Sequence, residues 1–161
     1  RILRELSDFD FFWVEIDTPH PEALADVRRG SSQTISSCES LITLTSFLPY
    51  FQLRAMDVAI VDAVWTGIWQ SMKIAAAAEA HQLNVAPHNY YGHLATMMNA
   101  HMSAAIPNLR IMETDIDRIP WDHELFTVVP DIRDGMLHLP ETPGWGTEPI
   151  EEALTKYPPK G

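Results

Sequence analysis

The chain has 161 residues, 46% of them hydrophobic and 20% charged, which is the composition of a globular domain with enough apolar residues for a core. Its net charge of −11 argues against a nucleic-acid partner, because phosphate binding needs clustered Lys and Arg. Cys38 is the only cysteine, so an intrachain disulfide is excluded and a reducing, cytoplasmic compartment is expected, and no apolar run approaches the ~18 residues of a membrane-spanning helix.

Short strands and helices alternate from the start of the chain. Residues 9–14 are almost continuously apolar and aromatic, as in a strand buried on both faces. Residues 22–29 are predicted to form a short helix, which begins near Pro21 and is stopped by Gly30. A small β-branched strand follows at 34–38.

The alternation continues through the middle of the chain. Residues 40–52 are predicted to be a helical stretch that is bent or interrupted at Pro49. Residues 57–61 form the next strand, and 68–82 form the clearest helix, since the alanines at 75–78 have high helix propensity.

A last pair of strands encloses the second long helix. The strand at 85–86 precedes a helix at 93–105, which Pro107 ends before a strand at 109–112. Strand and helix thus alternate five times with a period near 25 residues, as parallel βα units do. A helical solenoid could share this period, but each unit here includes a strand. A full (β/α)₈ barrel needs ~250 residues, so the predicted fold is α/β, a partial TIM barrel of about five βα units.

The composition changes after residue 120. Frequent prolines and glycines leave room for helix only at 150–156. Segments 126–129 and 136–139 could pair as a small antiparallel ribbon. We therefore expect residues 1–120 to be barrel and 121–161 to be a C-terminal extension.

One ionisable residue stands at the end of each predicted strand. These residues are Glu15, Glu39, Asp62, His88 and Glu113, at intervals of 23 to 26 residues. In a parallel barrel, the carboxyl ends of the strands and the loops after them form the active-site face. The sequence therefore predicts that the five side chains project to one rim.

The chemistry of this rim favours a divalent cation. Four acids at one edge repel each other unless a cation neutralises them, and oxygen ligands suit a hard ion such as Mg²⁺. Glu15 and Glu39, on adjacent strands, are natural co-ligands. Asp62 could accept a hydrogen bond from His88, which would orient the imidazole and raise its basicity for acid–base catalysis.

Each rim residue also has a purely structural interpretation. A single acid after a strand is commonly a loop residue or a helix cap, and a histidine in a polar loop is often only that. The regular interval, rather than any one residue, favours a functional rim. A hydrolase barrel with a divalent metal is disfavoured, because such sites generally use several histidines and only His88 stands at a strand end.

A set of short motifs resembles a known family. The motifs are Phe12-Trp13-Val14-Glu15 with Pro19, Glu22-Ala23-Leu24-Ala25, Cys38-Glu39-Ser40, Asp57 to Asp62 with Gly67, Lys73-Ile74-Ala75, Ala86-Pro87-His88, Pro107-Asn108 with Glu113, and Pro143-Gly144-Trp145-Gly146. In their order and spacing, the chain resembles the C-terminal portion of the enolase superfamily, in the branch of mandelate racemase, muconate lactonizing enzyme and the acid-sugar dehydratases. The resemblance covers almost the whole chain, although each motif alone is weak.

The resemblance implies a role for each rim residue. Glu15 and Glu39 would be the second and third carboxylate ligands of Mg²⁺. Asp62 and His88 would be the Asp–His dyad on consecutive strands, and Glu113 would contact the substrate or its developing enolate. The implied reaction begins with removal of the proton α to a carboxylate in a small-molecule substrate.

The chain also departs from the family pattern. Cys38 stands where the family has a glycine before the third ligand, and Ile68 replaces a second glycine after Gly67. The segment Glu15-Ile16-Asp17 leaves open whether Asp17 replaces the second acid of the usual pair. These departures affect the expected pocket shape more than the ligand roles.

The resemblance also implies that much of an enzyme lies outside these residues. The chain would supply strands 4 to 8 of the barrel, whereas the capping domain, the lysine base and the first metal-ligand Asp would precede Arg1. Residues 121–161 would pack on that capping domain. We expect the chain alone to be catalytically incomplete, with a companion chain or a longer parent enzyme, itself a homo-oligomer, supplying the rest.

The leading hypothesis is an Mg²⁺-dependent acid-sugar dehydratase, a lyase in which protonated His88, held by Asp62, helps to expel the β-hydroxyl. The first alternative is an isomerase, a racemase or epimerase of a 2-hydroxy acid, in which His88 itself takes the α-proton. The second alternative is a non-catalytic barrel fragment. The same residues serve both enzymes, so the sequence leaves the choice between them open.

Overall fold

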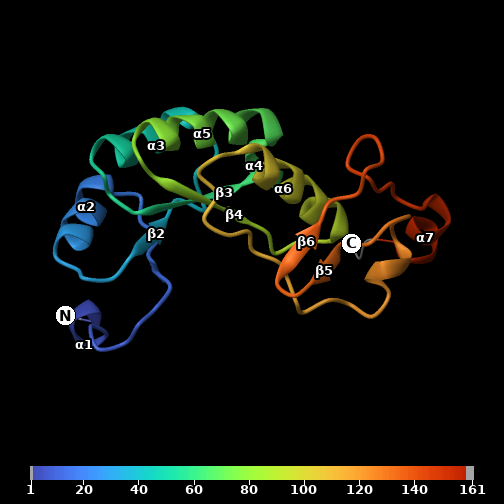
Figure 1. Cartoon of the computed structure of the whole chain (residues 1–161), viewed down its shortest axis with the longest axis horizontal. Helices are drawn as coiled ribbons and strands as arrows, with labels where there is room; N and C mark the ends of the chain where they lie inside the picture. The colour runs from blue at the N-terminus through green and yellow to red at the C-terminus, as the bar shows by residue number, and fades with distance from the viewer. Residues whose placement is uncertain (1, 159–161) are drawn as a thin grey trace.

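Four parallel strands form the centre of the computed structural model, which describes residues 2–158 (Figure 1). The strands are β1 (Val14–Glu15), β2 (Ile35–Ser37), β3 (Val58–Asp62) and β4 (Asn84–His88), and they pair in sequence order. The register pairs Val14 with Ile35, Ser36 with Val58, and Asp62 with His88. Because every neighbour is parallel, the carboxyl ends of all four strands meet at one edge of the sheet.

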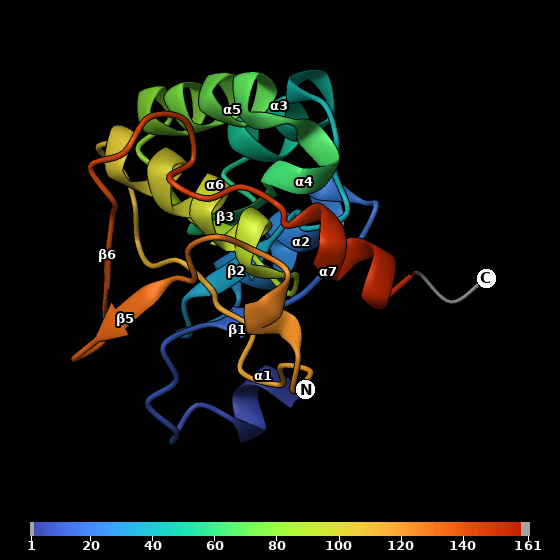
Figure 2. The ribbon, with the colours of Figure 1, turned by 90° about the vertical axis from the view of Figure 1, so that its right-hand side faces the viewer.

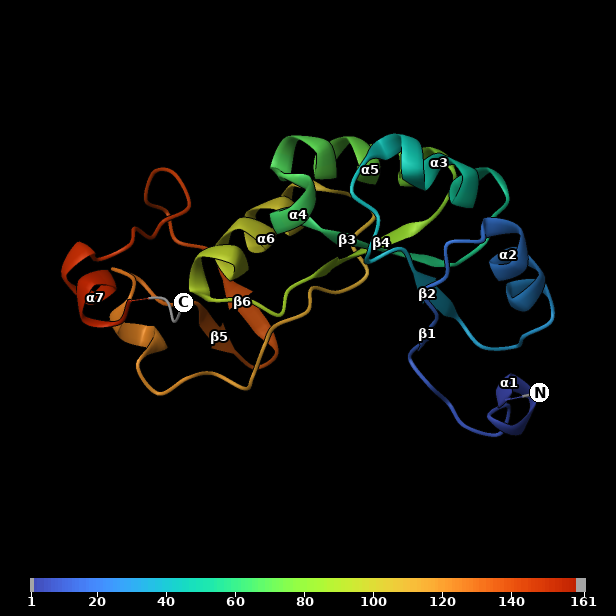
Figure 3. The same cartoon turned by 180° about the vertical axis from the view of Figure 1, so that it is seen from behind.

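Helices alternate with the strands, as the sequence pattern predicted, and α1 precedes the first strand. They are α1 (Ile2–Glu5), α2 (Pro21–Arg29), α3 (Leu44–Gln52), α4 (Ala63–Thr66), α5 (Ile68–Ala80) and α6 (His93–Ala105). Helices α3 and α5 lie on the same side of the strands in all three views (Figures 1, 2 and 3). Within residues 2–158, no helix combines the length and apolarity needed to cross a bilayer.

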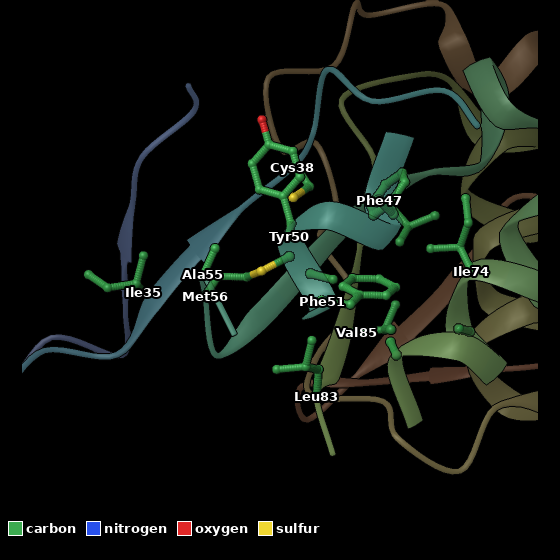
Figure 4. Close-up of a cluster of buried hydrophobic side chains, with 14 of the residues drawn as sticks. Ile35, Cys38, Phe47, Tyr50, Phe51, Ala55, Met56, Ile74, Leu83 and Val85 are labelled. Carbon is green, nitrogen blue, oxygen red and sulfur yellow. The ribbon is translucent and has the colours of Figure 1, made fainter. Parts of the chain in front are cut away.

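Two faces of the sheet have different packing. Along β3, Ala59 and Val61 belong to the main core beneath the helices, where Phe47 and Phe51 of α3 lie beside Ile74 and Val85 (Figure 4). The alternate residues Val58 and Ile60 form a small cluster with Ala86 and Trp13 on the other face. This alternation is the consequence of the two-residue period of a strand. By the same period, Asp62 and His88 belong to the face that carries Val58, Ile60 and Ala86.

Two helical predictions need adjustment. The helix predicted at 40–52 begins only at Leu44, because the Thr43 side chain accepts a hydrogen bond from the Ser46 amide and caps it. It then runs through Pro49 to Gln52 without interruption. The helix predicted at 68–82 is confirmed as α5, but the short α4 before it was not predicted.

The strand predicted at 109–112 is not a regular strand. An isolated parallel bridge joins Leu109 to Val85, the Arg110 amide donates to the Val85 carbonyl over 2.8 Å, and the Glu113 amide donates to the Pro87 carbonyl over 3.2 Å. The segment is therefore extended beside β4, but among the described residues no strand pairs with its other side. The hydrogen bonds between this segment and β4 are too few for a regular strand, so four parallel strands, rather than five, form the sheet.

The C-terminal extension contains η1 (Asp122–Glu124), β5 (Asp131–Arg133), β6 (Met136–His138) and α7 (Glu151–Lys156). The ribbon predicted from 126–129 and 136–139 is wrong in its first strand, since β5 pairs with β6 across the two-residue turn Asp134-Gly135. Both turn residues have positive φ, of 52° and 75°, which this tight hairpin turn requires. The helix predicted at 150–156 is confirmed as α7. The predicted packing of the extension on a capping domain stays a prediction.

Candidate active site

The five predicted rim residues lie at the carboxyl edge of the sheet. Glu15, Asp62 and His88 are the last residues of β1, β3 and β4, whereas Glu39 follows β2 by two residues and Glu113 lies in the extended segment beside β4. All except Asp62 line one cavity of ≈ 330 Å³. The other lining residues are Phe12, Trp13, Ile60, Ala86, Pro87, Ile111 and Met112. The rim is thus a polar edge above an apolar floor.

Asp62 holds one nitrogen of the His88 imidazole. The Oδ2 atom of Asp62 lies 2.9 Å from Nδ1 of His88, and the Asp62 side chain is almost fully buried. Its Oδ1 atom accepts hydrogen bonds from the backbone amides of Val64 at 2.8 Å and Trp65 at 3.0 Å, which caps α4. An ionised carboxylate accepts, so the proton of the Asp62–His88 bond resides on Nδ1. The other ring nitrogen, Nε2, takes no part in this bond and is available to a molecule in the cavity.

Two carboxylates face the free nitrogen of His88. Nε2 lies 3.3 Å from Oε1 of Glu39 and 3.7 Å from Oε2 of Glu113. Glu113 is held in turn by the backbone amide of Asn89, which donates to its Oε2 over 2.7 Å. With Nδ1 held by Asp62, the geometry leaves Nε2 of His88 placed to exchange a proton with a molecule bound in the cavity.

Glu15 lies in an acidic environment. Burial raises the pKa of its carboxyl, and the negative charges of Glu39, Asp17 and Glu113 raise it further, in that order. The Ser36 hydroxyl, 3.4 Å from Glu15 Oε2, has a smaller opposing effect. Repulsion of this kind is relieved when a cation binds between the acids.

The carboxylates of Glu15 and Glu39 fit a hard cation such as Mg²⁺ in their chemistry, because both are oxygen donors on the same cavity. Within residues 2–158, however, no three His, Cys, Asp or Glu side chains are grouped closely enough to hold a metal ion by themselves. Glu15 and Glu39 are therefore the two candidate ligands that the described residues offer at this cavity.

Two further residues support this rim through contacts that the sequence did not predict. Oδ1 of Asp17 accepts hydrogen bonds from the Cys38 amide at 2.8 Å and the Ser37 hydroxyl at 3.1 Å, so Asp17 joins the ends of β1 and β2. Asp17 thereby holds the backbone of Cys38, the residue before Glu39. Tyr91 donates its hydroxyl to Asp62 Oδ2. No spacing in the sequence signals either contact, because each joins residues at least 20 positions apart.

Comparison with known proteins gives a consistent result. The family model described as enolase C-terminal domain-like matches residues 1–153. The D-xylonate dehydratase of Haloferax volcanii is 29% identical over 151 residues, which are 91% of this chain and 36% of that protein. The D-gluconate dehydratase of Thermoproteus tenax is 32% identical over 143 residues, which are 86% of this chain and 29% of that protein.

A solved structure from Burkholderia xenovorans, bound to magnesium and fumarate, is provisionally named an L-alanine-DL-glutamate epimerase. It is 62% identical to this chain and has a TM-score of 0.96. The match covers 99% of this chain and 40% of the chain in that structure. The chain thus spans 40% or less of the length of these three relatives. The predicted fold class, a partial barrel, is confirmed by this match, with four regular strands.

Proposed function

The chain belongs to the enolase C-terminal domain-like family, and from this premise we propose that it supplies the acid–base edge of an Mg²⁺-dependent acid-sugar dehydratase. The observation that carries the proposal is the Asp62–His88 pair, with Nε2 of His88 beside two carboxylates on a cavity. The curated relatives named above are sugar-acid dehydratases, which favours this substrate class. The remaining barrel strands and the base for the α-proton would come from chain outside these residues.

His88 would act as the proton donor in the elimination. After a base removes the α-proton, Nε2–H of His88 gives its proton to the β-hydroxyl, the C–O bond breaks and water leaves. The enol that remains becomes a 2-keto-3-deoxy acid. Asp62 stabilises the imidazolium before this transfer and orients the neutral ring after it.

Glu15 and Glu39 would hold Mg²⁺, together with a third ligand from outside the chain. When bound, Mg²⁺ would stabilise the negative charge that develops on the substrate carboxylate after the α-proton leaves. Support comes from the solved relative that contains magnesium and fumarate, a dicarboxylate. Glu113, held by the Asn89 amide, would contact the substrate on the other side of Nε2.

A racemase or epimerase is the second candidate. It is favoured by the provisional name of the solved structure that is 62% identical. In that reaction Nε2 of neutral His88 would take the α-proton from one face, and no bond to oxygen would break. The fumarate in that structure carries no amino group, so it gives no support to an amino-acid substrate for this chain.

One experiment separates these candidates. The full-length protein that contains this chain is incubated with Mg²⁺ and a panel of acid sugars and 2-hydroxy acids in D₂O, and the products are followed by NMR and mass spectrometry. A dehydratase forms a 2-keto-3-deoxy acid, whereas a racemase only exchanges the α-hydrogen and inverts its carbon. If no compound reacts in either way, both candidates fail and the non-catalytic alternative is favoured.

A further inference from the structure

Tyr91 contacts both members of the dyad from outside the cavity, and we propose that it is a positioning residue that fixes the direction of the His88 imidazole through Asp62. The proposal rests on the proposed function, because it assumes that the direction of Nε2 matters for proton transfer. Tyr91 does not line the ≈ 330 Å³ cavity, so it would act through Asp62 and not by touching the substrate.

The hydroxyl and the ring of Tyr91 act on the same pair of residues. The hydroxyl donates to Oδ2 of Asp62 over 2.5 Å, and the same oxygen lies 2.9 Å from Nδ1 of His88. The Tyr91 ring meets the His88 ring edge-on, with centroids 5.6 Å apart and planes at 85°. Rotation of the imidazole away from Asp62 would therefore disturb this ring contact as well as its hydrogen bond.

The Asp62 carboxylate is saturated by these bonds. Oδ1 accepts from the amides of Val64 and Trp65, and Oδ2 accepts from Tyr91 and His88. At 1% exposure, Asp62 has almost no contact with water that could replace a lost partner. Burial and the bond to Asp62 raise the pKa of Tyr91 to about 12, so the hydroxyl keeps its proton and donates throughout the neutral range.

The backbone of Tyr91 is itself anchored by Arg118. Nη1 of Arg118 donates to the Tyr91 carbonyl over 2.7 Å and to Oδ2 of Asp122 over 3.1 Å, and Nη2 donates to Oγ1 of Thr96 over 3.1 Å. The guanidinium therefore fixes the loop between β4 and α6 to the segment after Glu113. A loop held in this way can keep the Tyr91 hydroxyl over Asp62.

Tyr91→Phe tests the proposal in the full-length, Mg²⁺-loaded protein. It removes the hydroxyl and keeps the ring. We expect kcat for dehydration to fall about 10-fold, in the range of a partly lost acid–base contribution, with KM changed less than about twofold because Tyr91 does not line the cavity. Exchange of the α-hydrogen with D₂O, which needs the other base, keeps its rate. Tyr90→Phe is the matched control, because Tyr90 is exposed and its hydroxyl faces Asp117.

Three outcomes would overturn the proposal. Equal losses of elimination and exchange in Tyr91→Phe, or the same loss in Tyr90→Phe, overturn the proposal. Protein labelled with ¹⁵N-histidine gives a second measurement that needs no substrate. The Nδ1–H signal of His88 should broaden in Tyr91→Phe and stay sharp in Tyr90→Phe, and an unchanged signal in Tyr91→Phe also overturns the proposal. A failed dehydratase assay in the unmodified protein would instead count against the proposed function.

Discussion

Asp62 and His88 stand directly opposite each other in the register of β3 and β4, with Oδ2 and Nδ1 2.9 Å apart. Both are the last residues of their strands, so parallel pairing alone brings them together. The contact leaves Nε2 pointing toward Glu39 and Glu113. This relationship is the basis of the proposed proton transfer.

The first prediction concerns the charge of Asp62. Asp62→Asn keeps the shape of the side chain and an oxygen that can cap α4, but its NH₂ group would face the Tyr91 hydroxyl and Nδ1–H of His88. Because these buried donors lose an acceptor, the free energy of unfolding should fall by about 1–3 kcal/mol. Asparagine cannot stabilise an imidazolium, so we expect kcat for dehydration to fall by about 10² or more. Steady-state kinetics and urea unfolding measure the two effects. Full activity in Asp62→Asn, judged against the exposed control Asp26→Asn, would refute the role of the dyad.

A second prediction concerns Glu15, metal and pH. The pKa of Glu15 is raised in the folded protein by burial and neighbouring acids, so the folded state binds its proton more tightly than the unfolded state. Stability from this group is present below the ordinary carboxyl value of 4.5 and is lost as pH rises through the raised value. In metal-free protein, Glu15→Gln should therefore be more stable than the parent at pH 7, and this advantage should vanish below about pH 4.

Addition of Mg²⁺ should reverse that order. In the proposed site the cation would stabilise the folded parent through Glu15 and Glu39, whereas Glu15→Gln would lose one ligand and gain less stability. Thermal unfolding with Mg²⁺ and with a chelator, at pH 7 and pH 4, is the measurement. Glu79→Gln, on the exposed surface of α5, is the control. Equal Mg²⁺ stabilisation of the parent and Glu15→Gln would remove Glu15 from the metal site.

A third prediction concerns the backbone before Glu39. Cys38 has φ of 90°, which glycine adopts freely and other residues adopt at a cost of ~1–3 kcal/mol. Cys38→Ala and Cys38→Gly both lose the buried thiol, but only glycine relieves the strain. Cys38→Gly should therefore be about 1 kcal/mol more stable to urea than Cys38→Ala.

The same pair of substitutions at Ser37 is the control for this prediction. Ser37 lies within β2, where extended backbone favours alanine over glycine by about 0.5–1 kcal/mol. The order of stabilities should therefore invert between positions 37 and 38. The same order at both positions would contradict the strain at Cys38.

Much of this rim could be predicted from sequence, because it follows from the order of the strands. Because β3 ends at Asp62 and β4 ends at His88, parallel pairing of these strands places the two residues side by side whatever loops intervene. The fifth strand was overpredicted, because the apolar run at 109–112 says nothing about whether a partner lies on its far side. The Asp134-Gly135 turn was a readable hairpin signal that the ribbon prediction did not use.

The supporting contacts were not predictable in the same way. Tyr91 lies in a polar loop, and its contact with Asp62 depends on how that loop folds back over the sheet. The sequence left open whether Asp17 replaces the second acid of the usual pair, and in the structure its carboxylate accepts hydrogen bonds from Cys38 and Ser37. Hydrogen bonds that join a loop residue to a distant strand leave no periodic trace in a sequence, so only the folded structure reveals them.

The proposed proton donation by His88 is tested most directly by His88→Asn in the full-length, Mg²⁺-loaded protein. The measurement is NMR in D₂O with an acid-sugar substrate, with His123→Asn, an exposed histidine in η1, as the control. If His88 donates this proton, His88→Asn lowers formation of the 2-keto-3-deoxy acid by about 10² or more while exchange of the α-hydrogen continues. Formation of the keto acid at the parent rate in His88→Asn would contradict it.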